Sequence, residues 1–240
     1  MGSMQKLFIC VSVIAVLLNS CSNGTGNKSV KLSVVNKLMT EDYVNIMCER
    51  GLDSIWAVEE YRAALRDIIT DSTIDDEPKF IAAEILFFKD STFPNETESH
   101  ILSQIYPEML KKGKYQFYFI MEDRNHNSHE RNNFLSLGKK TIPYLYNMLD
   151  NNNSYFTPFH SNCERPLRIK DIACSFICQQ LNILYTHYTD SIQNFRFIDS
   201  VKIKIPDSLK IMPAAIVREV SDPGVIYIHS SRLIRKMIMT

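Results

Sequence analysis

The sequence predicts a mainly α-helical protein with a small β element near its C-terminus. Apolar residues recur at helical spacing through most of residues 38–188. Three glycines, Gly51, Gly113 and Gly138, directly follow such runs, where helices commonly end on a residue with positive φ. A hydrophobic content of 45% with 22% charged residues is typical of a packed domain. We therefore expect a helical domain over residues 38–188, preceded by a leader and a tether and followed by an α/β extension.

The first twenty residues have the pattern of a secretory signal peptide. Lys6 supplies a positive charge, and residues 7–18 form an almost entirely apolar run. This run is too short to cross a bilayer as a helix. Residues 1–20 are therefore expected to be a leader that is removed on export.

The leader ends in a more specific motif. The residues Leu18-Asn19-Ser20-Cys21 resemble the lipobox of bacterial lipoproteins, whose cysteine becomes the lipidated N-terminus. The resemblance implies acyl chains such as palmitate on Cys21, and several such chains anchor a protein stably in a membrane. Ser22 implies sorting to the outer membrane of the cell envelope, with the domain facing the periplasm. Residues 21–37 would then be the lipidated cysteine and a flexible tether; the alternative is an ordinary secreted protein cut near Ser20.

Residues 38–188 contain a series of predicted helices. Their first turns carry capping, acidic or proline residues, and several of them end at glycine. Pro107 is expected to break or kink the fourth helix, because proline lacks a backbone N–H. The expected helices cover residues 40–50, 53 or 54 to 69, 76–88, 97–112, 134–137, 141–149 and 166–177.

One part of this region resembles a known repeat. The segments Leu137-Gly138, Ile142-Pro143-Tyr144-Leu145 and Leu149-Asp150 are similar to the join between paired helices in HEAT-type repeats. The resemblance implies short antiparallel helix pairs that bury their faces against neighbouring pairs. An irregular all-α domain is the alternative. Both architectures supply binding surfaces without implying a particular chemistry.

The C-terminal extension, residues 189–240, has a different pattern. Residues 189–200 are expected to form a helix, and the alternation of residues 201–205 predicts a strand. Residues 216–220 and 225–229 flank Ser221-Asp222-Pro223-Gly224, which is typical of a β-hairpin with a central turn.

The connecting segments supply the candidate binding residues. Residues 115–121 are aromatic-rich and fit either a short strand or a packed connector, while residues 122–133 and 151–166 are polar and predict loops. Three aromatic residues in the second loop have no obvious core to fill. We therefore expect Tyr155, Phe156 and Phe159 to form a surface for a partner or ligand.

The same two loops hold the metal-ligand candidates. His126 and His129 are separated by two residues, as are His160 and Cys163. Zinc accepts imidazole and thiolate ligands at such spacings. The four side chains are thus a candidate metal site, although solvated loop residues explain the pattern equally well.

Four cysteines lie beyond Cys21, at Cys48, Cys163, Cys174 and Cys178. An envelope location permits disulfides, and four cysteines allow three pairings that the sequence does not distinguish. Cys174 and Cys178 lie one helical turn apart, which favours small apolar core residues over a bridge.

Composition excludes several functional classes. Equal numbers of basic and acidic residues, 27 of each, argue against sequence-independent nucleic-acid binding. The isolated glycines form no dinucleotide-binding, phosphate-binding or serine-hydrolase motif. We therefore expect a non-catalytic, lipid-anchored protein-binding module without a cofactor, in its most concrete form an immunity-type inhibitor that masks a toxin. The alternatives are a metal-dependent envelope hydrolase and a small-ligand-binding or outer-membrane assembly lipoprotein.

Overall fold

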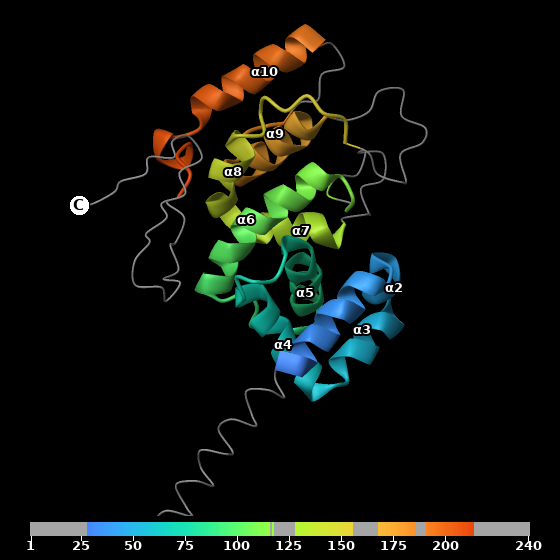
Figure 1. The fold of residues 1–240 in the computed structure, drawn as a ribbon. Coiled ribbons are helices and arrows are strands. Elements are labelled where there is room, and N and C mark those ends of the chain that lie inside the picture. Colours follow the sequence, from blue (N-terminus) through green and yellow to red (C-terminus); the bar gives the residue numbers. More distant parts are fainter. Residues whose placement is uncertain (1–27, 116, 118–127, 156–167, 186–190, 214–240) are drawn as a thin grey trace, which may run out of the picture.

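The computed structural model describes residues 28–115, 117, 128–155, 168–185 and 191–213. Within these residues the chain is mainly α-helical, which confirms the predicted fold class (Figure 1). The helical residues 28–40 come first. They are followed by α2 (Tyr43–Met47), α3 (Glu49–Trp56), α4 (Glu59–Thr70), α5 (Asp76–Lys89), α6 (Glu96–Lys112), α7 (His129–Ser136), the 3-10 turn η1 (Gly138–Thr141), α8 (Ile142–Tyr146), α9 (Ile169–Gln180), α10 (Ser191–Lys204) and the 3-10 turn η2 (Asp207–Leu209).

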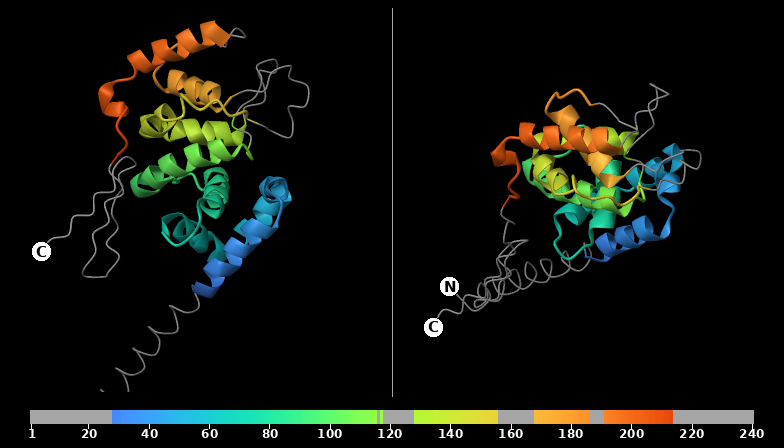
Figure 2. Two further views of the ribbon diagram at one scale, coloured as in Figure 1. Left: turned by 45° about the horizontal axis from the view of Figure 1, so that its top comes forward. Right: turned by 90° about the horizontal axis from the view of Figure 1, so that it is seen from above.

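The helices form an elongated stack. Residues 28–40, α2 and α3 lie at one end, and α10 lies at the other end, beyond α9 (Figures 1 and 2). Helices that follow one another in sequence pack together, with α4 against α5, α5 against α6, α8 against α9 and α9 against α10. The packing of sequence neighbours is what short helix pairs would produce, while the resemblance to HEAT-type repeats stays a prediction.

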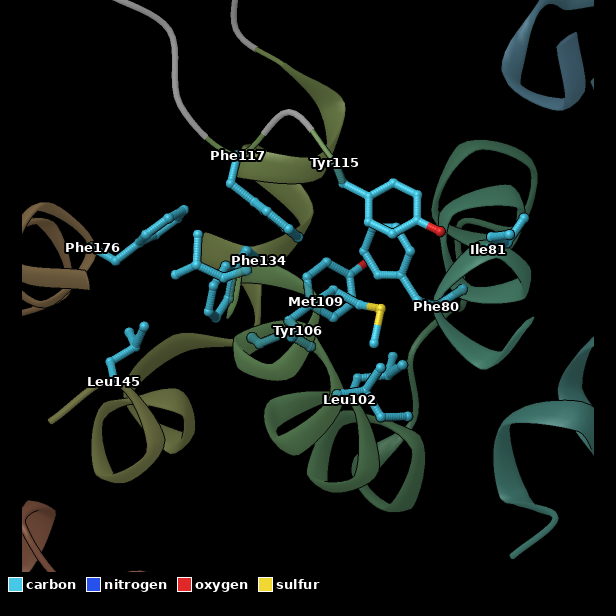
Figure 3. Packing of buried hydrophobic residues seen from close by; sticks show 14 of the residues in the cluster. Phe80, Ile81, Leu102, Tyr106, Met109, Tyr115, Phe117, Phe134, Leu145 and Phe176 are labelled. Atoms are coloured by element: carbon cyan, nitrogen blue, oxygen red, sulfur yellow. The ribbon is translucent and has the colours of Figure 1, made fainter. Parts of the chain in front are cut away.

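A chain of aromatic rings runs through the centre of the stack (Figure 3). The ring centroids of Phe80 and Tyr106 lie 5.0 Å apart, those of Tyr106 and Phe134 lie 5.5 Å apart, and those of Phe134 and Phe176 lie 4.4 Å apart. Aromatic pairs at such distances add stability beyond the area that they bury. Because these rings come from α5, α6, α7 and α9, they join the middle of the fold into one core.

The start and end of α6 follow the sequence signals closely. The Asn95 side chain accepts a hydrogen bond from the Glu98 backbone N–H at 2.9 Å, and the Glu98 carboxylate accepts one from the Asn95 backbone N–H at 2.8 Å. This reciprocal pair is a capping box. Gly113 ends the helix with a φ of 64°, as predicted.

The buried carboxylate of Glu98, at the start of α6, forms an ion pair with Arg66 of α4. The Arg66 guanidinium donates to both oxygens of Glu98, at 2.8 and 2.9 Å, and to Asp90 at 2.7 Å. Hydrogen bonds with Thr92 and Arg66 lower the pKa of Asp90 to about 2. The paired charges fix how the turn after α5 lies against α4.

The predicted helix end at Gly51 is wrong. Gly51 lies inside α3, and the predicted helix over residues 40–50 is instead divided between α2 and α3. A Cβ at Gly51 would lie 2.1 Å from the backbone oxygen of Asn45 and 2.6 Å from that of Ile46. The glycine therefore permits α3 to approach α2 closely, and it does not end a helix. The helix expected from residue 53 or 54 is also divided, between α3 and α4.

Pro107 does not break α6. The helix continues through this residue to Lys112, and Pro107 is buried. Leu102, Tyr106 and Met109 anchor the turns on both sides of it in the core. Tertiary packing thus outweighs the cost of the missing backbone hydrogen bond.

Residues 201–205 form no strand. They continue α10 to Lys204, because Ile198, Val201 and Ile205 are buried at helical spacing. Within the described residues, the β structure is an isolated bridge between Ser154 and Arg168. The predicted hairpin over residues 216–229 lies outside the described residues.

The predicted flexible tether over residues 21–37 is wrong for residues 28–37. Over residues 28–37 the chain is helical, and Val34 and Leu38 are buried in the core. Their spacing of four residues places both on one face of this helix. Any flexible tether is therefore confined to residues 21–27, which lie outside the described residues.

Candidate functional site

A groove of about 700 Å³ lies between the helical residues 28–40 and the connection from α4 to α5. Its apolar lining comes from both sides, and polar residues add to it. The lining residues are Lys28, Lys31, Leu32, Val35, Met39, Asp71, Thr73, Ile74, Asp75 and Pro78. The groove therefore lies at the end of the stack opposite α10.

The spacing of apolar residues on the first helix explains the apolar wall. Val34 and Leu38 face the core, while Leu32, Val35 and Met39 follow one another at intervals of three and four residues on an adjoining face. Leu32 is 61% exposed, which is high for a leucine in a folded domain. One helix thus serves both the core and the groove.

An ion pair holds the two sides of the groove together. The Lys31 ammonium donates a hydrogen bond to Asp71, and the same carboxylate accepts from the Thr73 hydroxyl at 2.7 Å and the Thr73 backbone N–H at 2.9 Å. These hydrogen bonds, with that from Lys31 the strongest, hold the pKa of Asp71 well below its usual range. The shape of the groove is therefore fixed by charge as well as by packing.

A second cluster of polar side chains lies inside the core. Glu84 on α5 is wholly buried, and its carboxyl accepts hydrogen bonds from the Tyr106 hydroxyl and, at 2.8 Å, from the Asn133 amide. Burial raises the pKa of Glu84 to about 8 and that of Tyr106 well above its usual range. The cluster joins α5, α6 and α7.

Glu130 and Tyr43 extend this cluster toward α2. The Tyr43 hydroxyl donates to the Glu130 carboxylate at 2.9 Å, and the Tyr43 ring packs edge-on against Tyr115 at 4.9 Å. Burial and the two nearby carboxylates, Glu84 and Glu130, raise the pKa of Tyr43 well above its usual range.

No motif in the sequence predicted this cluster of Glu84, Tyr106, Asn133, Glu130 and Tyr43. Its signal was Glu84, the one acidic residue within the otherwise apolar residues 80–88 of α5. A buried carboxyl group with a raised pKa can mark a catalytic site. Here the enclosed carboxyl of Glu84 offers no surface to a substrate, so the arrangement fits a structural role.

Most of the predicted metal ligands lie outside the described residues, namely His126, His160 and Cys163. His129 begins α7 and is exposed, with its ring 5.7 Å from that of Phe88. In the part of the chain that the structure describes, no three His, Cys, Asp or Glu side chains are grouped as for a metal ion. The four-residue metal site stays a prediction.

Of the three predicted aromatic binding residues, Tyr155 is the one that lies in the described residues. Tyr155 is buried, so it does not contribute the exposed ring that the loop pattern suggested. Its hydroxyl donates to the Tyr115 backbone oxygen and accepts from the Phe117 backbone N–H at 3.0 Å. Phe156 and Phe159 lie outside the described residues, and so does the predicted lipidation site, Cys21.

The cysteines of the described residues are unbridged. Cys174 and Cys178 are buried on α9, as expected for small core residues, and Cys48 is exposed. The Cys48 sulfur accepts a hydrogen bond from the Gly51 backbone N–H at 3.4 Å and so caps α3. Cys163 lies outside the described residues.

Comparison with known proteins adds no relative: no protein-family model matches the chain, and no similar protein is found among curated proteins or solved structures. The helices of the described residues include none that is long and apolar enough to cross a membrane.

Proposed function

We propose that the chain is a lipid-anchored protein of the bacterial envelope that binds a protein partner without catalysis. The observation that carries this proposal is the open, largely apolar groove beside the helical residues 28–40. Its wall combines exposed Leu32 and Met39, and methionine adapts readily to the shape of a partner. Apolar centres with polar edges are typical of protein interfaces.

The rim of the groove carries charges of both signs. Lys28 lies near its start, and Asp75 lies on the opposite side. A partner that places apolar side chains into the groove can orient itself by opposite charges at these edges. An apolar helical segment of the partner suits this shape, because Leu32, Val35 and Met39 repeat along about two turns.

The predicted anchor places such an interface near the membrane. Residues 22–27 separate Cys21 from Lys28, and even a fully extended chain of this length spans only about 24 Å. A partner bound in the groove is therefore held close to the bilayer. This position suits an immunity-type inhibitor that masks a toxin at the envelope.

Affinity capture tests the proposal. The full chain is purified from envelopes in mild detergent as wild type, as Leu32→Glu and as Val44→Glu. Val44 is 63% exposed, like Leu32, but it does not line the groove, so it is the matched control. We expect one partner at near-equal stoichiometry with wild type and Val44→Glu, and its loss with Leu32→Glu.

Either of two results would contradict the proposal: no retained partner, or equal retention by all three proteins. If a partner is retained, its toxicity to cells that lack this protein decides the immunity interpretation. A harmless partner would favour an envelope assembly role instead.

The volume of the groove supports one other function. About 700 Å³ is within the usual range of small-molecule sites. A small apolar ligand would raise the melting temperature of wild type and Val44→Glu but not that of Leu32→Glu. This result without a protein partner would make the chain a ligand-binding lipoprotein.

A further inference from the structure

The wall that residues 28–40 contribute to the groove has the spacing of a helix-packing seam. Its residues follow one another at intervals of four, three and four, namely Lys28, Leu32, Val35 and Met39. Alternation of these two intervals is the pattern by which one helix packs lengthwise against another. From residue 28 to residue 39 the seam is about 17 Å long, or about three helical turns. The wall is therefore shaped for a second helix that lies beside it.

The charged residues of the groove differ in whether they are paired. Lys31 and Asp71 form an ion pair with each other, so their charges are already balanced. Lys28 and Asp75 are both exposed, and neither side chain forms a hydrogen bond or ion pair with any residue that the structure describes. Two opposite charges are thus left for a partner to meet.

We propose that the partner inserts an amphipathic helix lengthwise along residues 28–40, with an acidic residue facing Lys28 and a basic residue facing Asp75. Its apolar residues recur at intervals of three and four, to match the seam. This inference rests on the proposed function, because it describes the part of the partner that enters the same groove.

The position of Lys28 carries the charge pattern of the partner. It occupies one position of a seam whose other members are apolar. A lysine at a single seam position weakens packing and determines the register and choice of the partner helix. A partner helix with a basic residue at this position is rejected, because like charges would be brought together.

The opposite wall supports the same arrangement. Ile74 and Pro78 supply apolar contacts there, and Asp75 lies between them in sequence. A helix in the groove is therefore covered on two sides, each of which is apolar with one unpaired charge. Such a helix removes more apolar surface from water than one that rests on a single helix face.

Three labelled helical peptides test the inference. They share one apolar stripe at intervals of three and four residues, and they differ at the two positions designed to face Lys28 and Asp75. One peptide carries an acid and a base there, one carries two acids, and one carries two bases. Their affinities are measured by fluorescence anisotropy for the full chain in mild detergent, and Leu32→Glu gives the background.

The measurement compares wild type with Asp75→Lys, Lys28→Glu and Glu60→Lys. Glu60 is exposed on α4 and does not line the groove, so its reversal is the matched control. We expect wild type and Glu60→Lys to bind the mixed peptide at least about fivefold more tightly than either like-charged peptide. Asp75→Lys should instead prefer the peptide with two acids, and Lys28→Glu the peptide with two bases.

The same order of affinities for all four forms, or no binding above the Leu32→Glu background, would overturn the inference. This failure is distinguishable from failure of the proposed function. If Leu32→Glu loses the captured partner while the order of peptide affinities ignores the charges at positions 28 and 75, the proposed function stands and the inference is wrong.

Discussion

At the scale of single residues, two buried polar side chains determine much of how the helices are held together. Glu84 joins α5 to α6 and α7 through Tyr106 and Asn133. Tyr155 joins the segment after η1 and α8 to residues 115–117. Each group satisfies hydrogen-bond donors or acceptors that would otherwise be buried without a partner, which is costly.

The first prediction concerns the pH dependence of stability. The pKa of Glu84 is raised by burial to about 8 in the folded chain, so between roughly pH 4.5 and pH 8 the folded state binds more protons than the unfolded state. The free energy of unfolding should therefore fall as pH rises through this window. Glu84→Gln removes this loss, because an amide has no charge to bury.

Thermal unfolding from pH 5 to pH 9 measures this effect. We expect the melting temperature of Glu84→Gln, relative to wild type, to rise by several degrees across the range. Glu108→Gln, at an exposed residue of α6, is the control and should follow wild type. A constant difference between Glu84→Gln and wild type at all pH values would show that Glu84 does not become charged in this window.

The second prediction concerns Tyr155. Tyr155→Phe leaves the Phe117 backbone N–H and the Tyr115 carbonyl without their shared partner inside the core. We expect a loss of about 1–3 kcal/mol in the free energy of unfolding, measured by urea denaturation. Tyr61→Phe, at a partly exposed residue, should change it by less than about 0.5 kcal/mol. Equal effects of the two substitutions would contradict the assigned role.

Tyr155 also shows where prediction from sequence fails at this scale. It follows three asparagines and a serine in a polar loop, so the local pattern predicted an exposed loop residue. Its hydrogen-bond partners lie 38 and 40 residues away, and no local pattern reports such a contact. Glu84 was missed for the same reason, because its partners come from α6 and α7.

At the scale of elements, sequence signals succeeded where they act locally. The start of α5 at Asp76 and the end of α6 at Gly113 were predicted from acidic residues, proline and glycine near the helix ends. Residues 201–205 were misassigned because Val201 and Ile205, two members of the alternation, also lie four residues apart on one helical face, while Ile203 is exposed on the other side. Only the packing of α10 against α9 distinguishes the two interpretations.

Gly51 gives the prediction at the element scale. A Cβ there meets backbone atoms of α2, which cannot rotate away as a side chain could. Gly51→Ala should therefore force α3 away from α2 and lower the free energy of unfolding by about 2 kcal/mol or more.

Gly138→Ala is the comparison for this prediction. Gly138 has a φ of 68°, and an added Cβ meets no atom within 4 Å. Its replacement should cost only the backbone strain of about 1 kcal/mol. Denaturant unfolding of both variants checks the order, and a larger loss for Gly138→Ala would contradict the close-approach explanation.

At the scale of the whole molecule, exposed apolar residues lie at both ends of the helical stack. The groove adjoins the helical residues 28–40. Helix α10, which carries exposed Phe195 and Ile203, lies at the far end of the stack from these residues (Figure 1). The sequence predicted the anchor motif and the helical class, but not the groove. The groove depends on how residues 28–40, which were expected to be a flexible tether, pack beside the connection from α4 to α5.

The anchor itself gives the prediction at this scale. Mass spectrometry of the mature chain should show an N-terminal Cys21 that carries acyl chains, with residues 1–20 removed. Cys21→Ser should move the protein out of the washed membrane fraction or leave it with its leader attached, since acyl chains are the proposed anchor. A mature chain that begins elsewhere and carries no lipid would contradict the lipoprotein proposal while leaving the groove proposal open.

The most direct test of the central claim is the affinity of the captured partner for three forms of the chain. Isothermal titration compares wild type, Leu32→Glu and the control Val44→Glu. We predict a dissociation constant at least about tenfold higher for Leu32→Glu, equivalent to about 1.4 kcal/mol, and one within about twofold of wild type for Val44→Glu. Equal dissociation constants for all three forms would show that the groove is not the binding site.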